Sequence, residues 1–493
     1  MKKLVARFIS LALAAALLLC ACGPAASGGQ PTPGEEGLDP ANPITLTLWH
    51  YYVGENQQAL ESAVSAFNQT IGIEKGVIVD AVAKGSIAEL EEAVTASAMG
   101  IINAEPMPDL FSSYPDKAME IDALDMVCDL GAYFTQEEKD LYVQGFLADG
   151  IFEGDRFLLV PIVKSTELLY LNDTGWQAFA AAGGYEEGNL ATWEGLYEAA
   201  RAYYQWTDAE TPDTAWNGRG LMGFDSVANY VIIGCKQLGV DVIDAAGRQA
   251  VLDETALRRL FEVYYQGIAL GYFDAVGKFR SDDIKSGDLI AYVGSSSSAA
   301  YFPTWIEQDS AQADIAFQAL GYPVFQGGEA YAIQQGAGMC VANTGPARQA
   351  GAAIFLKWFT AVAQNIGFAM TTGYLPVQTA AYEDAAFTQA LTALREGDAS
   401  QNNVAAVYEI ALHQITEAGT YAAKPFDGSY SVRSILQSTL IDSALAGREA
   451  AAPVKQSGAA EDELLQALDV DTAFAAWIAE VKARLDDAGI AYK

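Results

Sequence analysis

Strand-like and helix-like segments alternate along the chain from Ile44 onward, and this alternation constrains the fold more than any other feature of the sequence. Residues 44–49 alternate apolar side chains with threonine, as a half-buried strand does, and residues 55–70 carry an apolar helical stripe. Repeated β–α units form parallel or mixed sheets covered by helices, so the sequence predicts an α/β protein. Later strands are expected at residues 77–82, 109–113, 157–160, 168–171, 290–293 and 315–320. Later helices are expected from Ser86 and over residues 192–204, 254–270 and 346–363, with a surface loop at residues 451–460.

Length and charge exclude several classes of protein. At 493 residues the chain is too long for a single hydrophobic core, and its 51% hydrophobic and 18% charged residues are typical of a folded protein. It has 63 acidic residues against 28 basic ones, a formal net charge of −35. Such a surface repels phosphate backbones and anionic lipids, so we expect no nucleic-acid partner and no docking on membranes through basic patches.

The N-terminus has the pattern of an export signal. A basic start precedes a short apolar run, Phe8–Leu19, and the next residues (CACG, 20–23) resemble the lipobox of bacterial lipoproteins. Cys22 follows the small Ala21 and therefore fits the lipidated position better than Cys20. We expect residues 1–21 to be a lipoprotein signal peptide and Cys22 to be a diacylated anchor at the extracellular face of the bacterial cell membrane. An ordinary signal peptide that contains cysteines stays open as the alternative.

Residues 22–43 are expected to form a flexible linker. They are rich in glycine, proline and acidic residues, show no hydrophobic period, and would reach roughly 25 Å as a flexible coil. No later segment has enough uninterrupted apolar residues for a transmembrane helix, so the tether would be lipid. Such a tether suits a binding protein and a tethered hydrolase alike.

The sequence lacks the common motifs for catalysis, metals and cofactors. It has no phosphate-binding glycine loop, no HExxH and no CxxC, and His50 and His413 are its only histidines. We therefore expect no enzymatic activity, no metal and no cofactor. A hydrolase that works through two facing carboxylates stays open, because 63 acidic residues allow many pairs. Apolar neighbours predict that Cys128, Cys235 and Cys340 are buried thiols.

Seven segments occur in the order and spacing of a known family. They are residues 46–52 (LTLWHYY), 108–114 (PDLFSSY), 160–172 (VPIVKSTELLYLN), 192–200 (TWEGLYEAA), 286–298 (SGDLIAYVGSSSS), 334–345 (QQGAGMCVANTG) and 371–382 (TTGYLPVQTAAY). By these segments the chain resembles the extracellular solute-binding proteins (family 1) of carbohydrate-type ABC importers. The resemblance implies an α/β, two-lobed periplasmic-binding-protein-like fold with a hinge and a ligand cleft between the lobes. It implies an N-terminal lobe of residues 44–163 and 323–362 and a C-terminal lobe of residues 164–322 and 363–493.

The resemblance also implies where an anionic ligand would bind. Residues 372–376 (TGYLP) and 430–433 (YSVR) are most similar to members that bind glycerol-3-phosphate. The positions that match the phosphate contacts of those members are Ser165, Ser295 or Ser296, Gly336, Tyr374 and Arg433. A guanidinium fork, hydroxyl donors and an accessible backbone N–H suit a phosphate. An ion pair that only braces Arg433 on a helix stays open.

The opposite end of the expected site departs from these members. Ile87 and Pro115 stand where hydrogen-bonding side chains are expected, with Tyr114 and Asp116 on either side of Pro115. We therefore expect a solute other than glycerol-3-phosphate, either another polyol phosphate or a neutral sugar.

An aromatic pair ends the first expected strand. Trp49 and His50 are expected at the cleft, where aromatic faces suit sugars, although Trp49 could instead pack between helices.

The function implied is that of a monomeric, lipid-anchored substrate-binding component of an ABC importer. It would capture a carbohydrate, a polyol or a sugar or polyol phosphate and deliver it to the permease subunits. The alternative is a membrane-tethered extracellular carbohydrate hydrolase.

Overall fold

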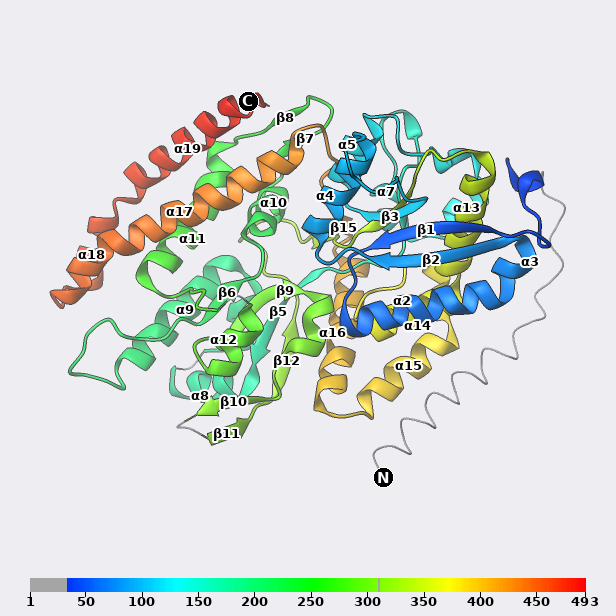
Figure 1. The fold of residues 1–493 in the computed structure, drawn as a ribbon. Coiled ribbons are helices and arrows are strands. Elements are labelled where there is room, and N and C mark those ends of the chain that lie inside the picture. The colour runs from blue at the N-terminus through cyan, green and yellow to red at the C-terminus, as the bar shows by residue number, and fades with distance from the viewer. Residues whose placement is uncertain (1–32, 184, 278, 309–310) are drawn as a thin grey trace.

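The computed structural model describes residues 33–183, 185–277, 279–308 and 311–493, which form two α/β lobes side by side (Figure 1). The lobe drawn in blue and cyan contains the first strands, and the green lobe carries the orange and red C-terminal helices along one side. The expected signal peptide, Cys22 and residues 22–32 of the expected linker lie outside the described residues.

The first lobe is built on a five-stranded sheet with the order β2-β1-β3-β14-β4. The strands are β1 (Ile44–His50), β2 (Val77–Ala83), β3 (Leu110–Ser113), β4 (Val160–Pro161) and β14 (Gly338–Val341). β1 runs parallel to β2 and β3, whereas β14 returns from far along the chain and pairs antiparallel with β3 and β4. The covering helices are α2 (Gly54–Phe67), α3 (Ile73–Lys75), α4 (Ile87–Ala98), α5 (Pro115–Asp122), α6 (Gln136–Asp140), α7 (Gln144–Ala148), α13 (Pro346–Thr360) and α14 (Val362–Thr372).

Strand alternation determines what each face of this sheet covers. Leu48 packs in one core with Leu60 of α2, while the next residue, Trp49, packs in another core with Leu90 of α4. α4 begins as expected, with a capping box in which Ser86 accepts from the backbone N–H of Glu89.

The second lobe is built on a four-stranded sheet with the order β12-β5-β9-β6. Its strands are β5 (Glu167–Asn172), β6 (Met222–Phe224), β9 (Ala291–Ser295) and β12 (Phe317–Leu320). Its helices are α8 (Asp173–Gly183), α9 (Trp193–Asp208), α10 (Val227–Gln237), α11 (Glu254–Leu270), α12 (Arg280–Ser286), α17 (Ser429–Gln456), α18 (Glu461–Leu468) and α19 (Val470–Asp487). The smaller elements are β7 (Ile243–Asp244), β8 (Gln249–Ala250), β10 (Trp305–Gln308), β11 (Ala311–Asp314) and β16 (Ala491–Tyr492).

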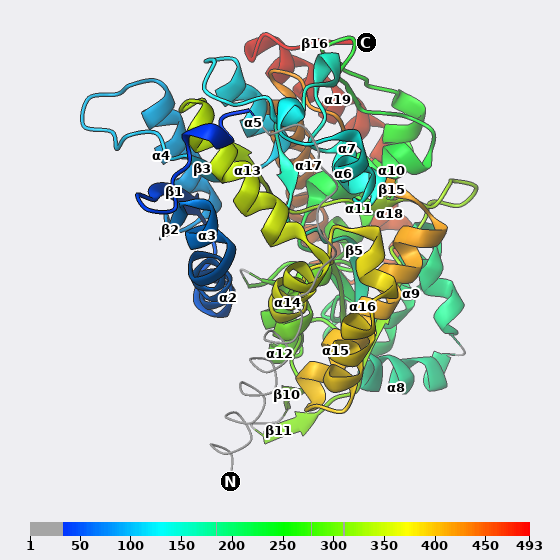
Figure 2. The same cartoon turned by 90° about the vertical axis from the view of Figure 1, so that its right-hand side faces the viewer.

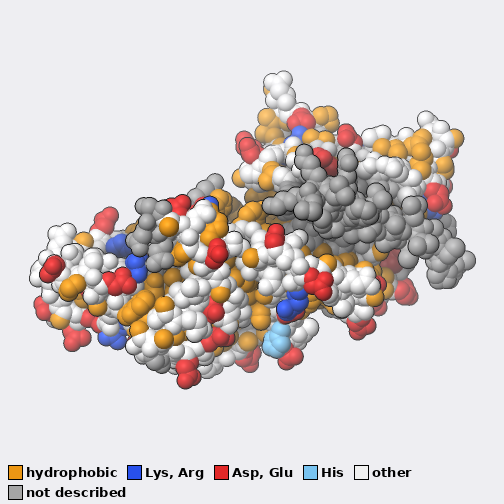
Figure 3. Space-filling model, turned by 90° about the horizontal axis from the view of Figure 1, so that it is seen from below, with side chains coloured by type: hydrophobic (Ala, Val, Ile, Leu, Met, Phe, Trp, Pro, Cys, Tyr) orange, Lys and Arg blue, Asp and Glu red, His pale blue; other side chains and the backbone are white. Residues whose placement is uncertain are grey.

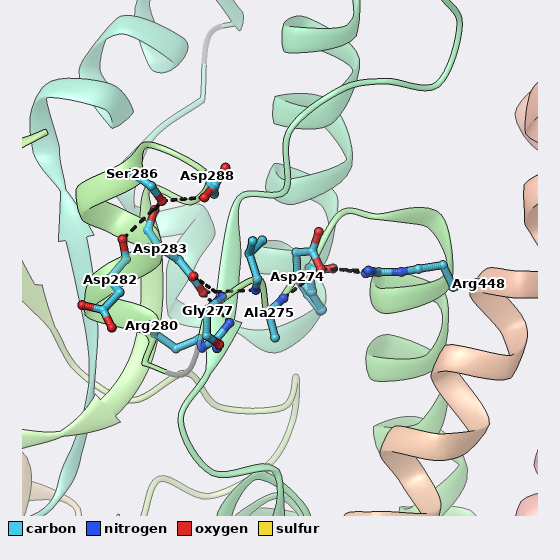
Figure 4. Close-up of polar contacts among 11 residues, drawn as sticks. Asp274, Ala275, Gly277, Arg280, Asp282, Asp283, Ser286, Asp288 and Arg448 are labelled. Atoms are coloured by element: carbon cyan, nitrogen blue, oxygen red, sulfur yellow. Dashed lines mark hydrogen bonds and ion pairs between the residues drawn. The ribbon is translucent and has the colours of Figure 1, made fainter. Parts of the chain in front are cut away.

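Polar contacts fix the segment that leads into β9 (Figure 4). Arg448 of α17 donates to the Asp274 carboxylate at 2.8 Å, and Asp283 accepts from the Gly277 backbone N–H at 2.6 Å. The first contact ties Asp274 to α17, and the second ties Gly277 to Asp283 of α12, the helix that precedes β9. The end of β9 contributes Ser295 to the site described below.

Three expectations about elements need correction. The single helix expected over residues 346–363 is two helices, because Ala361 adopts an extended conformation between α13 and α14. The loop expected at residues 451–460 is wrong over 451–456, since α17 continues through Pro453 and buries Ala451 completely. Of the strand expected at 157–160, only Val160 belongs to a strand, β4. Phe157 instead forms an isolated bridge with Ile151.

Three chain segments lie side by side between the lobes. Lys164 and Leu375 exchange both backbone hydrogen bonds at 3.1 and 2.6 Å, and Ser165 and Gln335 do the same at 2.9 Å each. The remaining elements are β13 (Ala332–Ile333), β15 (Thr420–Tyr421), α15 (Ala385–Arg395) and α16 (Ala399–Glu417), and α14 to α16 are grouped together in Figure 2. The predicted lobe boundaries after residues 163, 322 and 362 stay a prediction. Phe325 packs in the second-lobe core, and Phe368 of α14 contacts Tyr52.

Within the described residues, no single helix is long and apolar enough to cross a membrane. The pair α13 and α14 meets that criterion only when taken together, and the two axes differ by 69°.

Candidate ligand-binding site

A cavity of about 490 Å³ lies between the lobes. The first lobe contributes α4 and the start of α5, the second lobe contributes α10, the end of β9 and the start of α17, and the hinge contributes residues 334–336. The cavity therefore occupies the place where the sequence predicted a ligand cleft. The predicted residues that line it are Tyr114, Asp116, Ser165, Ser295, Gly336, Tyr374 and Arg433.

Arg433 is the basic residue of this lining, and it lies in the first turns of α17. Its guanidinium donates to Asn229 Oδ1 of α10, and no carboxylate of the described residues lies within ion-pair distance of it. Burial lowers the pKa of Arg433, while the nearby Glu167 and Asp116 carboxyls act in the opposite direction. Arg433 thus carries a partly buried positive charge without a direct counter-ion, which is the requirement for binding an anion.

Glu167 interacts electrostatically with Arg433 and is almost fully buried. Its Oε1 accepts from Asn229 Nδ2 at 2.6 Å and from Gln335 Nε2 at 3.0 Å, while Oε2 has no partner within the described part of the chain. Burial raises the pKa of Glu167 to about 7, although the hydrogen bond from Asn229 and the charge of Arg433 oppose the rise. Near neutral pH, Glu167 therefore compensates the charge of Arg433 only in part.

Hydroxyl groups and one glycine also line the cavity. Ser295 Oγ lies 2.9 Å from Ser297 Oγ, and both residues line the cavity. Gly336 has φ +111°, and an added Cβ there would lie 3.0 Å from the Val163 carbonyl oxygen. A side chain would be strained at this position, so glycine keeps the hinge backbone at the edge of the cavity.

The first lobe contributes an acidic wall to the cavity. Glu91 of α4 and Asp116 of α5 both line the cavity, together with Tyr114, Ile87 and Pro115. Burial raises the pKa of both carboxyls and raises that of Tyr114 to about 12. Lys117, the nearest base on α5, donates to Glu120 and Thr95 instead of pairing with either lining carboxylate.

Trp49, His50 and Ser296 are not among the cavity-lining residues of the described chain. Trp49 packs in the first-lobe core, with Lys84 Nζ 3.8 Å from the centroid of its ring. His50 is fully buried, and burial lowers its pKa. Ser296 is also buried and accepts a hydrogen bond from the Thr166 backbone N–H at 3.3 Å. These three side chains are buried in the protein instead of lining the cavity.

A buried ion pair closes the hinge side of the cavity. Lys164 Nζ lies 2.6 Å from Asp149 Oδ2, with side-chain exposures of 0% and 8%. Lys164 also donates to the Gly336 carbonyl at 3.1 Å. Asp149 lines the cavity, but its charge is balanced by Lys164.

The sequence reasoning did not single out Glu91, Asn229, Glu167 or Gln334. Gln334 lines the cavity and is 7% exposed, yet neither of its side-chain amide atoms has a partner within the described residues. Glu167 and Gln334 belong to two of the segments that carry the family resemblance. Each is a polar residue directly beside apolar residues, and this was the available signal.

A second, more open hollow of about 580 Å³ adjoins the cavity and shares Ile243, Tyr421 and Ala422 with it. Its carboxylates are engaged: Asp241 pairs with Lys236, Asp244 pairs with Lys493, and Asp253 accepts from the Ala256 backbone N–H. We place the candidate site in the inner cavity because the predicted residues Ser165, Tyr374 and Arg433 line it.

Two further expectations concern metal ligands and the cysteine thiols. Within the described chain, no three His, Cys, Asp or Glu side chains are grouped as metal ligands. Cys128, Cys235 and Cys340 are buried free thiols, as expected.

The outer surface is acidic where it can be seen. Figure 3 shows acidic side chains scattered over both lobes on the face viewed from below, with few basic ones between them. This distribution agrees with the formal net charge of −35.

Comparisons with known proteins point to one family. The family model of bacterial extracellular solute-binding proteins matches residues 62–394. UgpB from Mycobacterium tuberculosis, solved with glycerophosphocholine, is 21% identical with a TM-score of 0.65, covering 91% of this chain and 100% of that one. The cyclic α-maltosyl-1,6-maltose-binding protein from Arthrobacter globiformis is 17% identical with a TM-score of 0.63, covering 90% and 100%. The GacH receptor of Streptomyces glaucescens, solved unliganded and with acarbose, is 16% identical with a TM-score of 0.60, covering 89% and 98%. No curated protein sequence matches the chain.

Proposed function

This chain belongs to the bacterial extracellular solute-binding proteins and has their periplasmic-binding-protein-like fold, and we propose that it is the lipid-anchored binding component of an ABC importer. It captures a carbohydrate, a polyol or a sugar or polyol phosphate between its lobes and delivers it to the permease. Binding occurs without chemical conversion of the solute.

The observation that carries this proposal is the partly buried charge of Arg433 inside an interlobe cavity, with no carboxylate of the described residues within ion-pair distance. Ser165, Ser295, Gly336 and Tyr374 surround the same space and supply hydroxyl and backbone groups to an anionic or hydroxylated solute. A cavity of about 490 Å³ is of the size that small-molecule sites usually have.

The structural neighbours support a small polar solute. UgpB was solved with glycerophosphocholine and the GacH receptor with acarbose, and the third protein is named for a cyclic maltose derivative. Both phosphate-bearing and neutral sugar-like solutes are therefore included in the proposal for this chain.

A thermal-shift screen tests the proposed function. Sugars, polyols and their phosphates are added to the purified protein, and a ligand that binds only the folded state raises the melting temperature by mass action. We expect at least one class to raise it in the wild type and less so in Arg433→Ala. A panel without any shift, or recovery of chemically altered solute after incubation, contradicts the proposal.

A further inference from the structure

The two lobes contribute opposite charge to the cavity. Arg433 lies on the second lobe, whereas Glu91 and Asp116 lie on the first lobe, on α4 and α5. The third lining carboxylate, Asp149, is balanced by Lys164 at 2.6 Å. Among the described residues, Glu91 and Asp116 therefore line the cavity without an ion-paired cation, against the guanidinium of Arg433.

From this arrangement we infer that the solute is a zwitterion: an anionic group binds at Arg433, and an ammonium group binds between Glu91, Asp116 and the ring of Tyr114. The inference rests on the proposed function, because it identifies the solute class of the same cavity. An ammonium ion is attracted both by carboxylates and by the face of an aromatic ring.

Electrostatics disfavours a simple phosphate monoester in this cavity. A monoester carries close to two negative charges at neutral pH, and Arg433 can balance only about one of them. The remaining charge would face Glu91 and Asp116, while Lys117 is hydrogen-bonded to Glu120. A phosphodiester has one negative charge, and an attached ammonium group would meet the acidic wall.

Gln334 provides independent support for a polar solute in the same cavity. Its side chain is more than nine-tenths buried and lines the cavity, and neither amide atom has a protein partner within the described residues. Buried amides without partners are costly, so a bound solute with oxygen atoms between its charged ends would satisfy this side chain.

Calorimetry with two matched phosphodiesters tests the inference. Glycerophosphocholine and glycerophosphoglycerol share the glycerol phosphate part and differ in whether the second group carries an ammonium. We expect the wild type to bind glycerophosphocholine at least tenfold more tightly. Glu91→Gln combined with Asp116→Asn should abolish this preference, and Glu92→Gln, at an exposed position on the same helix, should leave it unchanged.

The possible failures can be told apart. Equal affinity for the two esters in the wild type, or a preference that survives in the double variant, overturns the inference. If the double variant does not unfold cooperatively, each single variant is measured and should lose part of the preference. If the wild type binds maltose but neither ester, the zwitterion inference falls and the proposed function stands; if no solute of the screening panel binds, the proposed function falls as well.

Discussion

Glu167→Gln tests how the ionisation of the buried Glu167 side chain affects the stability of the protein. The substitution keeps the Oε1 atom that accepts from Asn229 and Gln335, and it replaces Oε2, which has no partner within the described chain. It therefore removes the titration of Glu167 with little change in packing or hydrogen bonding.

The expected effect follows from the raised pKa of Glu167. Burial raises this pKa from an ordinary 4.5 to about 7, so the folded state holds the proton more tightly than the unfolded state does. The resulting stabilisation is complete below about pH 4.5 and is lost as the pH rises through about 7. At ~1.4 kcal/mol for each tenfold change in proton affinity, the loss is roughly 3 kcal/mol.

Urea unfolding of wild type and Glu167→Gln between pH 4.5 and 8.5 measures this difference. We expect similar free energies of unfolding at pH 4.5 and a variant that is more stable at pH 8 by up to roughly 3 kcal/mol. Glu92→Gln, an exposed glutamate, should show no such pH-dependent difference. A wild type that is as stable as Glu167→Gln at pH 8 would refute the reasoning about Glu167.

Three further predictions concern the site and the anchor. Arg433→Ala should weaken solute binding by roughly 2–4 kcal/mol, with partial recovery in Arg433→Lys because an ammonium lacks the planar fork; unchanged affinity in calorimetry would make Arg433 a structural brace. Asp149→Asn should lower the free energy of unfolding by roughly 3–5 kcal/mol, because it leaves the Lys164 ammonium buried and unpaired; equal urea midpoints and slopes for variant and wild type contradict this. Cys22→Ser should release the protein from the membrane fraction or leave it unprocessed, and loss of lipidation in Cys20→Ser instead would show that the anchor is misassigned.

Local sequence patterns predicted the elements whose ends are determined by nearby residues. α11 spans Glu254–Leu270 as expected, because Asp253 caps its start and Gly271 takes a left-handed conformation after its end. The break at Ala361 has no such signal, since neither glycine nor proline occurs there. The insertion of β14 between β3 and β4 is likewise a long-range pairing that periodicity cannot show.

Local sequence patterns were likewise insufficient to predict the whole candidate site. Arg433 and Gly336 were found through segments that resemble a family, and both line the cavity. Trp49 packs in a core with Leu90 of α4. The alternation in the sequence shows that neighbouring side chains point to opposite faces of the sheet, but it does not show which face the cleft lies on. Glu167 and Asn229 gain their significance only when β5, α10 and α17 meet, and this meeting is a property of the tertiary fold.

A crystal structure with the tightest-binding solute from the thermal-shift panel tests the central claim most directly. The account predicts an unmodified solute in the interlobe cavity, with an anionic or hydroxyl group hydrogen-bonded to Arg433 and the opposite end against Tyr114 and Asp116. A solute bound outside this cavity, or a hydrolysed product within it, would contradict the account.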